Sequence, residues 1–220
     1  MTLEYYSHFI FDLDGTLIDS ADEVLSCLGK AFELSGHRNP ISANLNVMKK
    51  FIGPPLDKII SSINPSLSPQ EIVAIAKEFK TLYDNSDYTK TSVFEGVSPL
   101  LETLHSRGIY TYIATNKREF PTRKIIEIKK LGPFRDVVCL DSSKSVSLTK
   151  TQMLETVVRK WSLHLPEVIM VGDSRSDLLA AREVGIHSVA VLQGYDESSS
   201  LLELKPNFVV NGVVDLLEML

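Results

Sequence analysis

Short apolar runs alternate with amphipathic segments along most of the chain. The first run, HFIF at residues 8–11, ends at Asp12 and has the length and composition of a buried strand. Strand patterns recur at residues 110–114, 136–140, 168–171, 187–191 and 207–210. Because these runs are apolar with little alternation, they are typical of a parallel sheet covered on both faces.

Helical patterns separate these strands, at residues 98–106, 119–130, 151–161, 176–184 and 213–220. Alternation of strands with amphipathic helices is typical of an α/β protein. The sequence therefore predicts a Rossmann-like parallel sheet in a three-layer α/β/α core.

The segment that starts at Ile18 and runs to about Tyr88 has a different pattern. It shows helical periodicity at residues 21–34, 56–63 and 69–85 and no convincing strand. One of these helices has a clear start, since SPQE at residues 68–71 supplies a cap, a first-turn proline and an acidic residue. We predict a helical domain at residues 18–89, inserted into an α/β core of residues 1–17 and 90–220.

Composition and charge narrow the functional classes. The 220 residues are 44% hydrophobic and 23% charged, as in ordinary globular proteins. A net charge of −5 disfavours a nucleic-acid partner, because phosphate backbones attract clustered Lys and Arg, although a local pocket can still bind a small anion.

Targeting signals and cysteine usage point to the cytoplasm. No apolar run approaches the ~18 residues of a membrane span, and the N-terminus lacks the pattern of a signal peptide. The two cysteines, Cys27 and Cys139, are too few and too far apart for a disulfide framework or a zinc site, and apolar neighbours make them candidate core residues. We expect a cytoplasmic protein without a membrane partner.

Two carboxylates leave the carboxyl end of the first predicted strand. The segment at residues 11–20 reads FDLDGTLIDS, so that Asp12 and Asp14 are followed by Gly15, which permits a tight turn. Ligand sites of open α/β sheets lie at the carboxyl ends of strands, which makes this a candidate site for chemistry. The segment resembles the first motif of the haloacid dehalogenase-like hydrolase superfamily, most of whose members are phosphatases.

The resemblance implies a two-step phosphoryl transfer. Asp12 would be the nucleophile that forms an aspartyl-phosphate, and Asp14 would be the general acid and then the general base. Splitting the reaction through a covalent intermediate replaces one difficult step with two easier ones. Gly15 and Thr16 would contribute to phosphate binding.

Two further motifs of the superfamily have counterparts after the inserted segment. IATNK at residues 113–117 resembles the second motif, which implies that the Thr115 hydroxyl and the Asn116 backbone N–H hold phosphate oxygens. The third motif is a lysine that offsets charge between nucleophile and phosphate. Lys150, at the start of a helical pattern, is the preferred candidate, and Lys144 is the alternative.

The fourth motif carries the candidate metal ligands. VIMVGDSRSD at residues 168–177 runs from an apolar strand into Asp173 and then Asp177. The resemblance implies Mg²⁺ bound by Asp12, the backbone carbonyl of Asp14 and Asp173, since this ion prefers hard oxygen ligands. Asp177 would be an outer-shell group, or a cap of the helix that follows.

Several features define the subgroup that the chain resembles. Asp14 favours phosphoryl transfer, because dehalogenases lack an acid at that position. The inserted helices resemble the cap of phosphoglycolate phosphatase-like proteins and their 5′-nucleotidase-like branch, as do FIGPPL at residues 51–56 and VLQGY at residues 191–195. The implied substrate is a small phosphorylated metabolite. A sugar-phosphate mutase, or a non-catalytic binding protein that keeps the fold, is the alternative.

Overall fold

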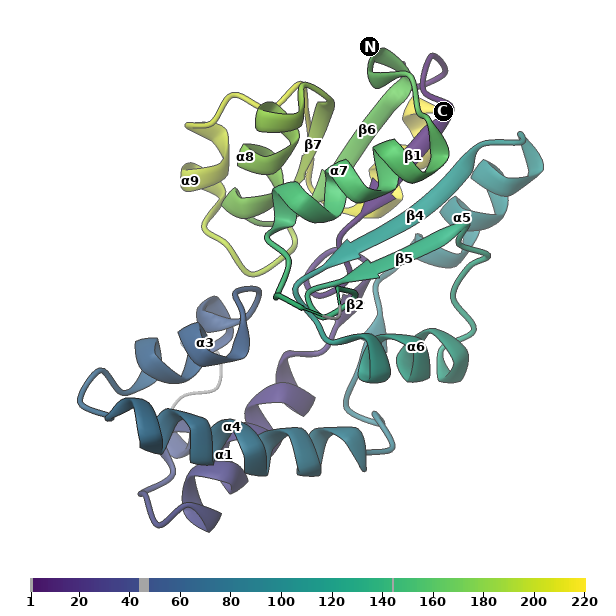
Figure 1. Cartoon of the computed structure of the whole chain (residues 1–220). Coiled ribbons are helices and arrows are strands. Elements are labelled where there is room, and N and C mark those ends of the chain that lie inside the picture. Colours follow the sequence, from purple (N-terminus) through teal and green to yellow (C-terminus); the bar gives the residue numbers. More distant parts are fainter. Residues whose placement is uncertain (1, 44–47, 144) are drawn as a thin grey trace. The chain divides into compact units, whose positions relative to one another are not determined.

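A computed structural model describes residues 2–43, 48–143 and 145–220 (Figure 1). The chain forms two compact units, one made of Met1–Asp19 with Val93–Leu220 and the other of Ser20–Ser92. Each unit has its own buried core. The assignment of a catalytic role to the first unit and of a cap role to the second remains a prediction.

The first unit contains a six-stranded sheet in the order β5-β4-β1-β6-β7-β8, in which every neighbouring pair is parallel. The strands are β1 (His8–Phe11), β4 (Tyr110–Thr115), β5 (Asp136–Cys139), β6 (Val168–Gly172), β7 (His187–Val191) and β8 (Phe208–Val210). Phe11, the last residue of β1, is in register with Ile113 of β4 and Val171 of β6. The residues that follow these three strands therefore emerge at one edge of the sheet.

Helices cover both faces of this sheet, so the predicted α/β fold class is confirmed. They are α5 (Val97–Ser106), α6 (Glu119–Ile128), α7 (Lys150–Trp161), α8 (Arg175–Val184), the short α9 (Ser198–Leu202) and the 3₁₀ helices η3 (Leu165–Glu167) and η4 (Val213–Met219). Ile10 of β1 packs in one cluster with Leu154 of α7 and Ala181 of α8. Phe9 and Phe11 point to the opposite face, by the alternation of strand side chains, and are fully buried there.

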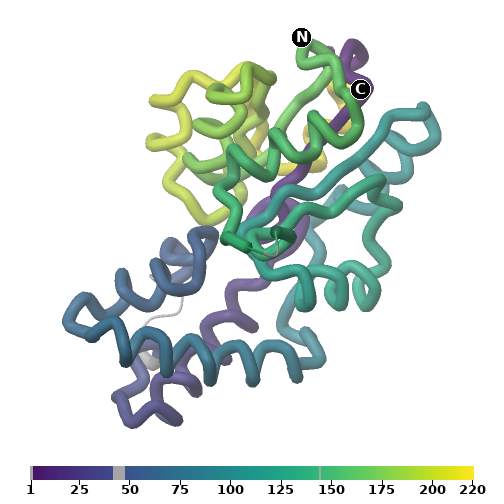
Figure 2. The backbone as a smooth tube through the Cα atoms, in the orientation of Figure 1, coloured from purple at the N-terminus to yellow at the C-terminus, as the bar shows by residue number. Residues whose placement is uncertain are grey.

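The second unit is helical. Its elements are α1 (Ala21–Leu34), η1 (Pro40–Ala43), η2 (Lys49–Phe51), α3 (Leu56–Ile63) and α4 (Pro69–Asp84). Helices α1 and α4 run side by side, as the backbone tube in Figure 2 shows. Buried Glu23 of α1 accepts hydrogen bonds from the Ser86 hydroxyl (2.6 Å) and the Lys90 backbone N–H (2.9 Å), which fixes the turn after α4 against α1. No helix of the described ranges is long and apolar enough to cross a membrane.

Three local predictions differ from the structure. Residues 18–19 form the strand β2 (Ile18–Asp19), which pairs with β3 (Ser92–Val93), whereas the sequence predicted no strand there. The segment predicted as a helix at residues 213–220 is the 3₁₀ helix η4, and α9 had no counterpart among the predictions. A strand of two residues and helices of five and seven residues are shorter than the apolar patterns that define strands and helices.

Candidate active site

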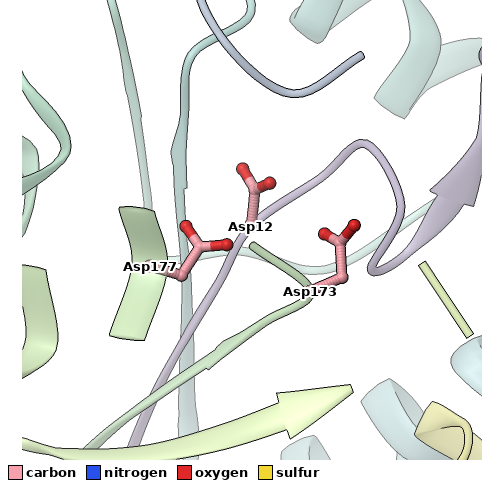
Figure 3. A group of neighbouring side chains, drawn as sticks. All are labelled: Asp12, Asp173 and Asp177. Carbon is pink, nitrogen blue, oxygen red and sulfur yellow. The ribbon is translucent and has the colours of Figure 1, made fainter. Parts of the chain in front are cut away.

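Three carboxylates meet at the sheet edge where β1 and β6 end (Figure 3). Asp12 follows β1, Asp173 follows β6, and Asp177 lies in the first turn of α8. One oxygen from each residue lies within 4.8 Å of the others. All three residues are buried, with 5%, 2% and 0% of their surface exposed respectively. The chain thus concentrates negative charge where water is largely excluded.

Burial and mutual repulsion disfavour the ionised forms of two of these acids. Burial raises the pKa of Asp12 to about 6, although the positive charge of Lys150 acts to lower it. Burial and the charges of Asp12 and Asp177 raise the pKa of Asp173 well above its usual range. A divalent cation would relieve this cost, and buried carboxylate oxygens are the hard ligands that Mg²⁺ accepts. The donor set therefore fits the metal implied by the sequence.

Lys150 supplies the positive charge beside the predicted nucleophile. It is the first residue of α7, and its Nζ lies 2.8 Å from Asp12 Oδ1, 2.9 Å from Asp177 Oδ1 and 2.8 Å from the Ala114 carbonyl oxygen. Burial alone lowers the pKa of Lys150, but the two carboxylates outweigh burial and raise it, so the ammonium stays charged. The alternative candidate, Lys144, lies outside the described residues.

Asp177 occupies the helix-cap position, one of the two positions that the sequence predicted for it, and also contacts Lys150. Its Oδ2 accepts hydrogen bonds from the Ser174 hydroxyl (2.7 Å) and the Ser174 backbone N–H (3.1 Å), which caps α8. Its Oδ1 faces Lys150. The cap thereby fixes a carboxylate that in turn holds the lysine against Asp12.

Asp14 is held by a lysine to which the sequence gave no role. Lys117 Nζ lies 2.9 Å from Asp14 Oδ2, and both side chains are largely buried. The backbone N–H of Lys117 donates to the hydroxyl oxygen of Thr115, the last residue of β4. Asn116 lies between them at the same edge of the sheet. The available signal for Lys117 was its place three residues after the strand predicted at residues 110–114.

Both oxygens of Asp173 have fixed partners. The Thr16 hydroxyl donates to Oδ1 and the Tyr195 backbone N–H donates to Oδ2, each at 2.9 Å. Gly15, at φ +83°, and Gly194 pass so close to this carboxylate that a Cβ atom on either would collide with it. Thr16, expected near phosphate, thus contacts a predicted metal ligand. Sequence reasoning could not foresee this, because it depends on two loops 157 residues apart.

The segment that follows β7, which includes Gln193 and Tyr195, forms further hydrogen bonds to residues near the end of β1. Gln193 Nε2 donates to the Thr16 carbonyl oxygen (3.3 Å), and the Tyr195 hydroxyl donates to Asp19 Oδ1 (2.9 Å). Besides Asp173, the segment therefore contacts Thr16 in the loop after β1 and Asp19, the last residue of β2. The resemblance to the subgroup includes residues 191–195, but it does not predict which residues they contact.

Comparison with known proteins agrees with this arrangement. A family model described as haloacid dehalogenase-like hydrolase matches residues 9–191. The chain belongs to this family. The match begins within β1 and ends with β7, and it includes the strand-end segments at β1, β4 and β6 as well as Lys150.

Curated relatives are similar over nearly the whole chain. A phosphoglycolate phosphatase from Vibrio cholerae is 27% identical over 217 residues, which cover 95% of this chain and 94% of the relative. A phosphoglycolate phosphatase from Vibrio vulnificus is 28% identical, with 100% and 98% covered. A pyrophosphatase, PpaX, from Halalkalibacterium halodurans is 26% identical, with 96% and 94% covered.

Solved structures share the fold. A haloacid dehalogenase-like family hydrolase from Streptococcus pneumoniae superposes with a TM-score of 0.86 at 24% identity, covering 98% of both chains. A crystal structure described as a predicted phosphatase from Clostridium acetobutylicum gives a TM-score of 0.85 at 24% identity, covering 97% of both chains. The family and the enzyme class predicted from the sequence, a phosphatase of this family, are confirmed.

Proposed function

We propose that the protein is a Mg²⁺-dependent phosphatase that hydrolyses a small phosphomonoester, phosphoglycolate-like or nucleotide-like, through an aspartyl-phosphate on Asp12. The observation that carries the proposal is the carboxylate of Asp12 at a strand end, 2.8 Å from the Lys150 ammonium and grouped with Asp173. A buried carboxylate held by a cation and next to a candidate metal ligand is suited to attack an anionic substrate.

The metal would be held by Asp12, Asp173 and the backbone carbonyl of Asp14. When bound, Mg²⁺ would neutralise charge on the phosphate oxygens and on the acidic cluster. Asp177 would stay outside the first shell, because the Lys150 ammonium already offsets the charge on its Oδ1 and its Oδ2 caps α8, whereas the partners of Asp173 are neutral donors.

In the first step, a carboxylate oxygen of Asp12 attacks phosphorus. The bond between phosphorus and the ester oxygen breaks, its electron pair stays on that oxygen, and Asp14, which enters this step in its protonated form, supplies the proton that completes the alcohol. Lys150 keeps the Asp12 carboxylate oriented and offsets the charge of the incoming phosphate.

In the second step, water attacks the phosphorus of the acyl phosphate. Asp14 takes a proton from the water, the bond between phosphorus and the Asp12 oxygen breaks, and inorganic phosphate leaves. The Thr115 hydroxyl oxygen accepts from Lys117 N–H, which leaves its own proton to donate to a phosphoryl oxygen, with the Asn116 backbone N–H beside it.

The test is phosphate release from phosphoglycolate, nucleoside 5′-monophosphates and hexose phosphates, with and without Mg²⁺. We expect metal-dependent release by the wild type, at least a thousandfold less by Asp12→Asn, and normal release by Glu127→Gln, an exposed control on α6. Interconversion of sugar phosphates without release would indicate a mutase. A folded, Mg²⁺-binding protein inactive on every ester would indicate a binding protein.

The proposed substrates fit the location expected from the sequence. Small phosphorylated metabolites are cytoplasmic compounds, and the thiols of Cys27 and Cys139 are both free and buried. We propose that the enzyme acts in the cytoplasm, on a soluble metabolite and without a nucleic-acid or membrane partner.

A further inference from the structure

A cavity of about 260 Å³ lies in the first unit, away from the acidic cluster. Its lining comes from α8, the start of β7 and the segment between α9 and β8, which lie together in Figure 1. The acidic cluster lies where β1 and β6 end. Because neighbouring strands of this sheet are parallel, the starts of β7 and β8 lie toward the opposite edge. The cavity is therefore separate from the candidate active site.

Basic side chains gather at the mouth of this cavity. Arg182 of α8, His187 of β7 and Lys205 line it, and all three residues are exposed. Among the residues that the structure describes, no carboxylate lines the cavity or forms an ion pair with any of the three. Local positive charge of this kind, on a chain of net charge −5, favours an anionic ligand.

The other polar groups of the lining can act as hydrogen-bond donors. Asn207 Oδ1 accepts from the Ser188 backbone N–H (2.9 Å), which leaves the amide N–H groups of Asn207 as donors. The Tyr6 hydroxyl lies 2.8 Å from His187 Nδ1 and can donate to it, so that the proton of the neutral ring stays on Nε2. The Ser188 residue is only 6% exposed, and its hydroxyl has no hydrogen-bond partner within the described ranges. An oxyanion would supply that partner.

The floor of the cavity is apolar. Leu178, Ile186 and Leu204 line it and are 3%, 6% and 9% exposed respectively. Arg182 is held beside this floor, because its Nη2 donates a hydrogen bond to the Leu204 carbonyl oxygen. A bare inorganic ion would leave the apolar floor uncovered, whereas a short carbon chain would bury it.

We propose that this cavity is an accessory binding site for a small organic phosphate, whose dianionic group pairs with Arg182 and Lys205 and whose carbon chain covers the apolar floor. Two permanent cations match a dianion better than a monocarboxylate, and the guanidinium fork suits phosphate oxygens. The inference does not depend on the proposed function, because no residue of the acidic cluster lines the cavity.

The test is a calorimetric titration of the metal-free protein with propylphosphonate, which has the charge of a phosphate and no ester bond to hydrolyse. Dissociation constants are measured for the wild type, Lys205→Glu, Arg182→Gln and the control Lys80→Glu, which makes the same charge change on an exposed lysine of α4. Lys205→Glu and Arg182→Gln should each weaken binding by about tenfold or more, because each removes a charge-assisted contact. The control should bind as the wild type does.

Two further ligands test the chemistry assigned to the site. Inorganic phosphate lacks the carbon chain, and butyrate carries the same chain on a single negative charge. Each should bind the wild type about fivefold or more weakly than propylphosphonate. Equal affinity for butyrate would overturn the assignment of a dianion, and equal affinity for inorganic phosphate would overturn that of an organic ligand.

Other results would overturn the site itself. One is a wild type that binds no propylphosphonate up to about 10 mM. Another is binding that persists in Lys205→Glu but is lost in Lys150→Gln, which would place the ligand in the candidate active site. Melting curves identify a variant that fails to fold, and Lys205→Glu decides the matter if Arg182→Gln does, because Lys205 is exposed. Phosphate release is measured separately, so failure of the proposed function would leave this inference standing.

Discussion

At the scale of single residues, two aspartates of the same unit have opposite electrostatic surroundings. Asp173 is buried among other carboxylates, and its pKa is raised. Asp136 is partly buried, which by itself raises its pKa, but hydrogen bonds from Lys160 (2.8 Å) and Trp161 Nε1 (3.0 Å) lower it instead. Ionisation therefore costs stability at the first site and contributes it at the second.

We expect the same substitution to have opposite effects on stability at these two positions. Without divalent metal at pH 7.5, Asp173→Asn should raise the melting temperature and Asp136→Asn should lower it, each by about 2 °C or more. Added Mg²⁺ should stabilise the wild type and Asp136→Asn but not Asp173→Asn. Thermal melts with and without the metal measure both effects, and a lower metal-free melting temperature for Asp173→Asn would contradict this account.

The two thiols should be unreactive in the folded protein. Burial raises the pKa of Cys27 to about 11 and that of Cys139 to about 12, and the thiolate is the reactive form. Less than one thiol per chain should react with a disulfide reagent within minutes at pH 8, and both should react in denaturant. Rapid labelling of the native protein would show that one of these sites opens.

At the scale of helices and strands, elements with a pronounced apolar pattern could be predicted and those without one could not. HFIF at residues 8–11 and the helices α1 and α3 have the bounds that the sequence predicted, because each combines a strong apolar pattern with polar ends. The pairing of β2 with β3 joins residues more than 70 positions apart. Local patterns contain no information about such a pairing.

Two capping boxes allow stability and activity to be separated. Ser68 caps α4 and Ser174 caps α8, each with an acidic residue three positions later. Ser68→Ala and Ser174→Ala should each destabilise the protein by about 1 kcal/mol. Only Ser174→Ala should also lower kcat on the preferred phosphomonoester, because its partner Asp177 holds Lys150 against Asp12. Denaturant unfolding and steady-state kinetics test this, and equal activity losses would remove Asp177 from the mechanism.

At the scale of the whole molecule, the acidic cluster should make metal-free stability depend on pH. The pKa of Asp12 is raised to about 6 and that of Asp173 is raised as well, so the folded state binds protons that the unfolded state has released. This contribution to stability is present at low pH and is lost as pH rises through about 6. His8, whose pKa is lowered by burial, acts in the opposite direction.

We therefore expect the metal-free protein to lose stability between pH 5.5 and pH 7.5. The loss should be smaller in saturating Mg²⁺, which replaces the protons as the partner of the carboxylates. Melting temperatures at both pH values, with metal and with a chelator, provide the comparison. A stability that rises over this range in both conditions would mean that His8 outweighs the acidic cluster.

Much of the candidate site could also be predicted from the sequence, for a reason of topology. Asp12 and Asp173 each follow an apolar strand and Thr115 ends one, and in a parallel sheet neighbouring strands end at the same edge. The partners that orient these residues could not be predicted. The contacts of Thr16 and Tyr195 with Asp173, and of Lys117 with Asp14, depend on the conformations of loops. No periodicity constrains those conformations.

The first unit is interrupted in sequence but nearly continuous in space. Phe94 N–H donates to the Leu17 carbonyl oxygen at 3.1 Å, so the chain returns to this unit beside the point where it left. A turn of a few residues could bridge that gap in place of the 73-residue Ser20–Ser92 segment, and the order of the six strands would not change. We therefore expect the six-stranded unit to fold when the Ser20–Ser92 segment is replaced by grafts of other lengths and folds at this junction.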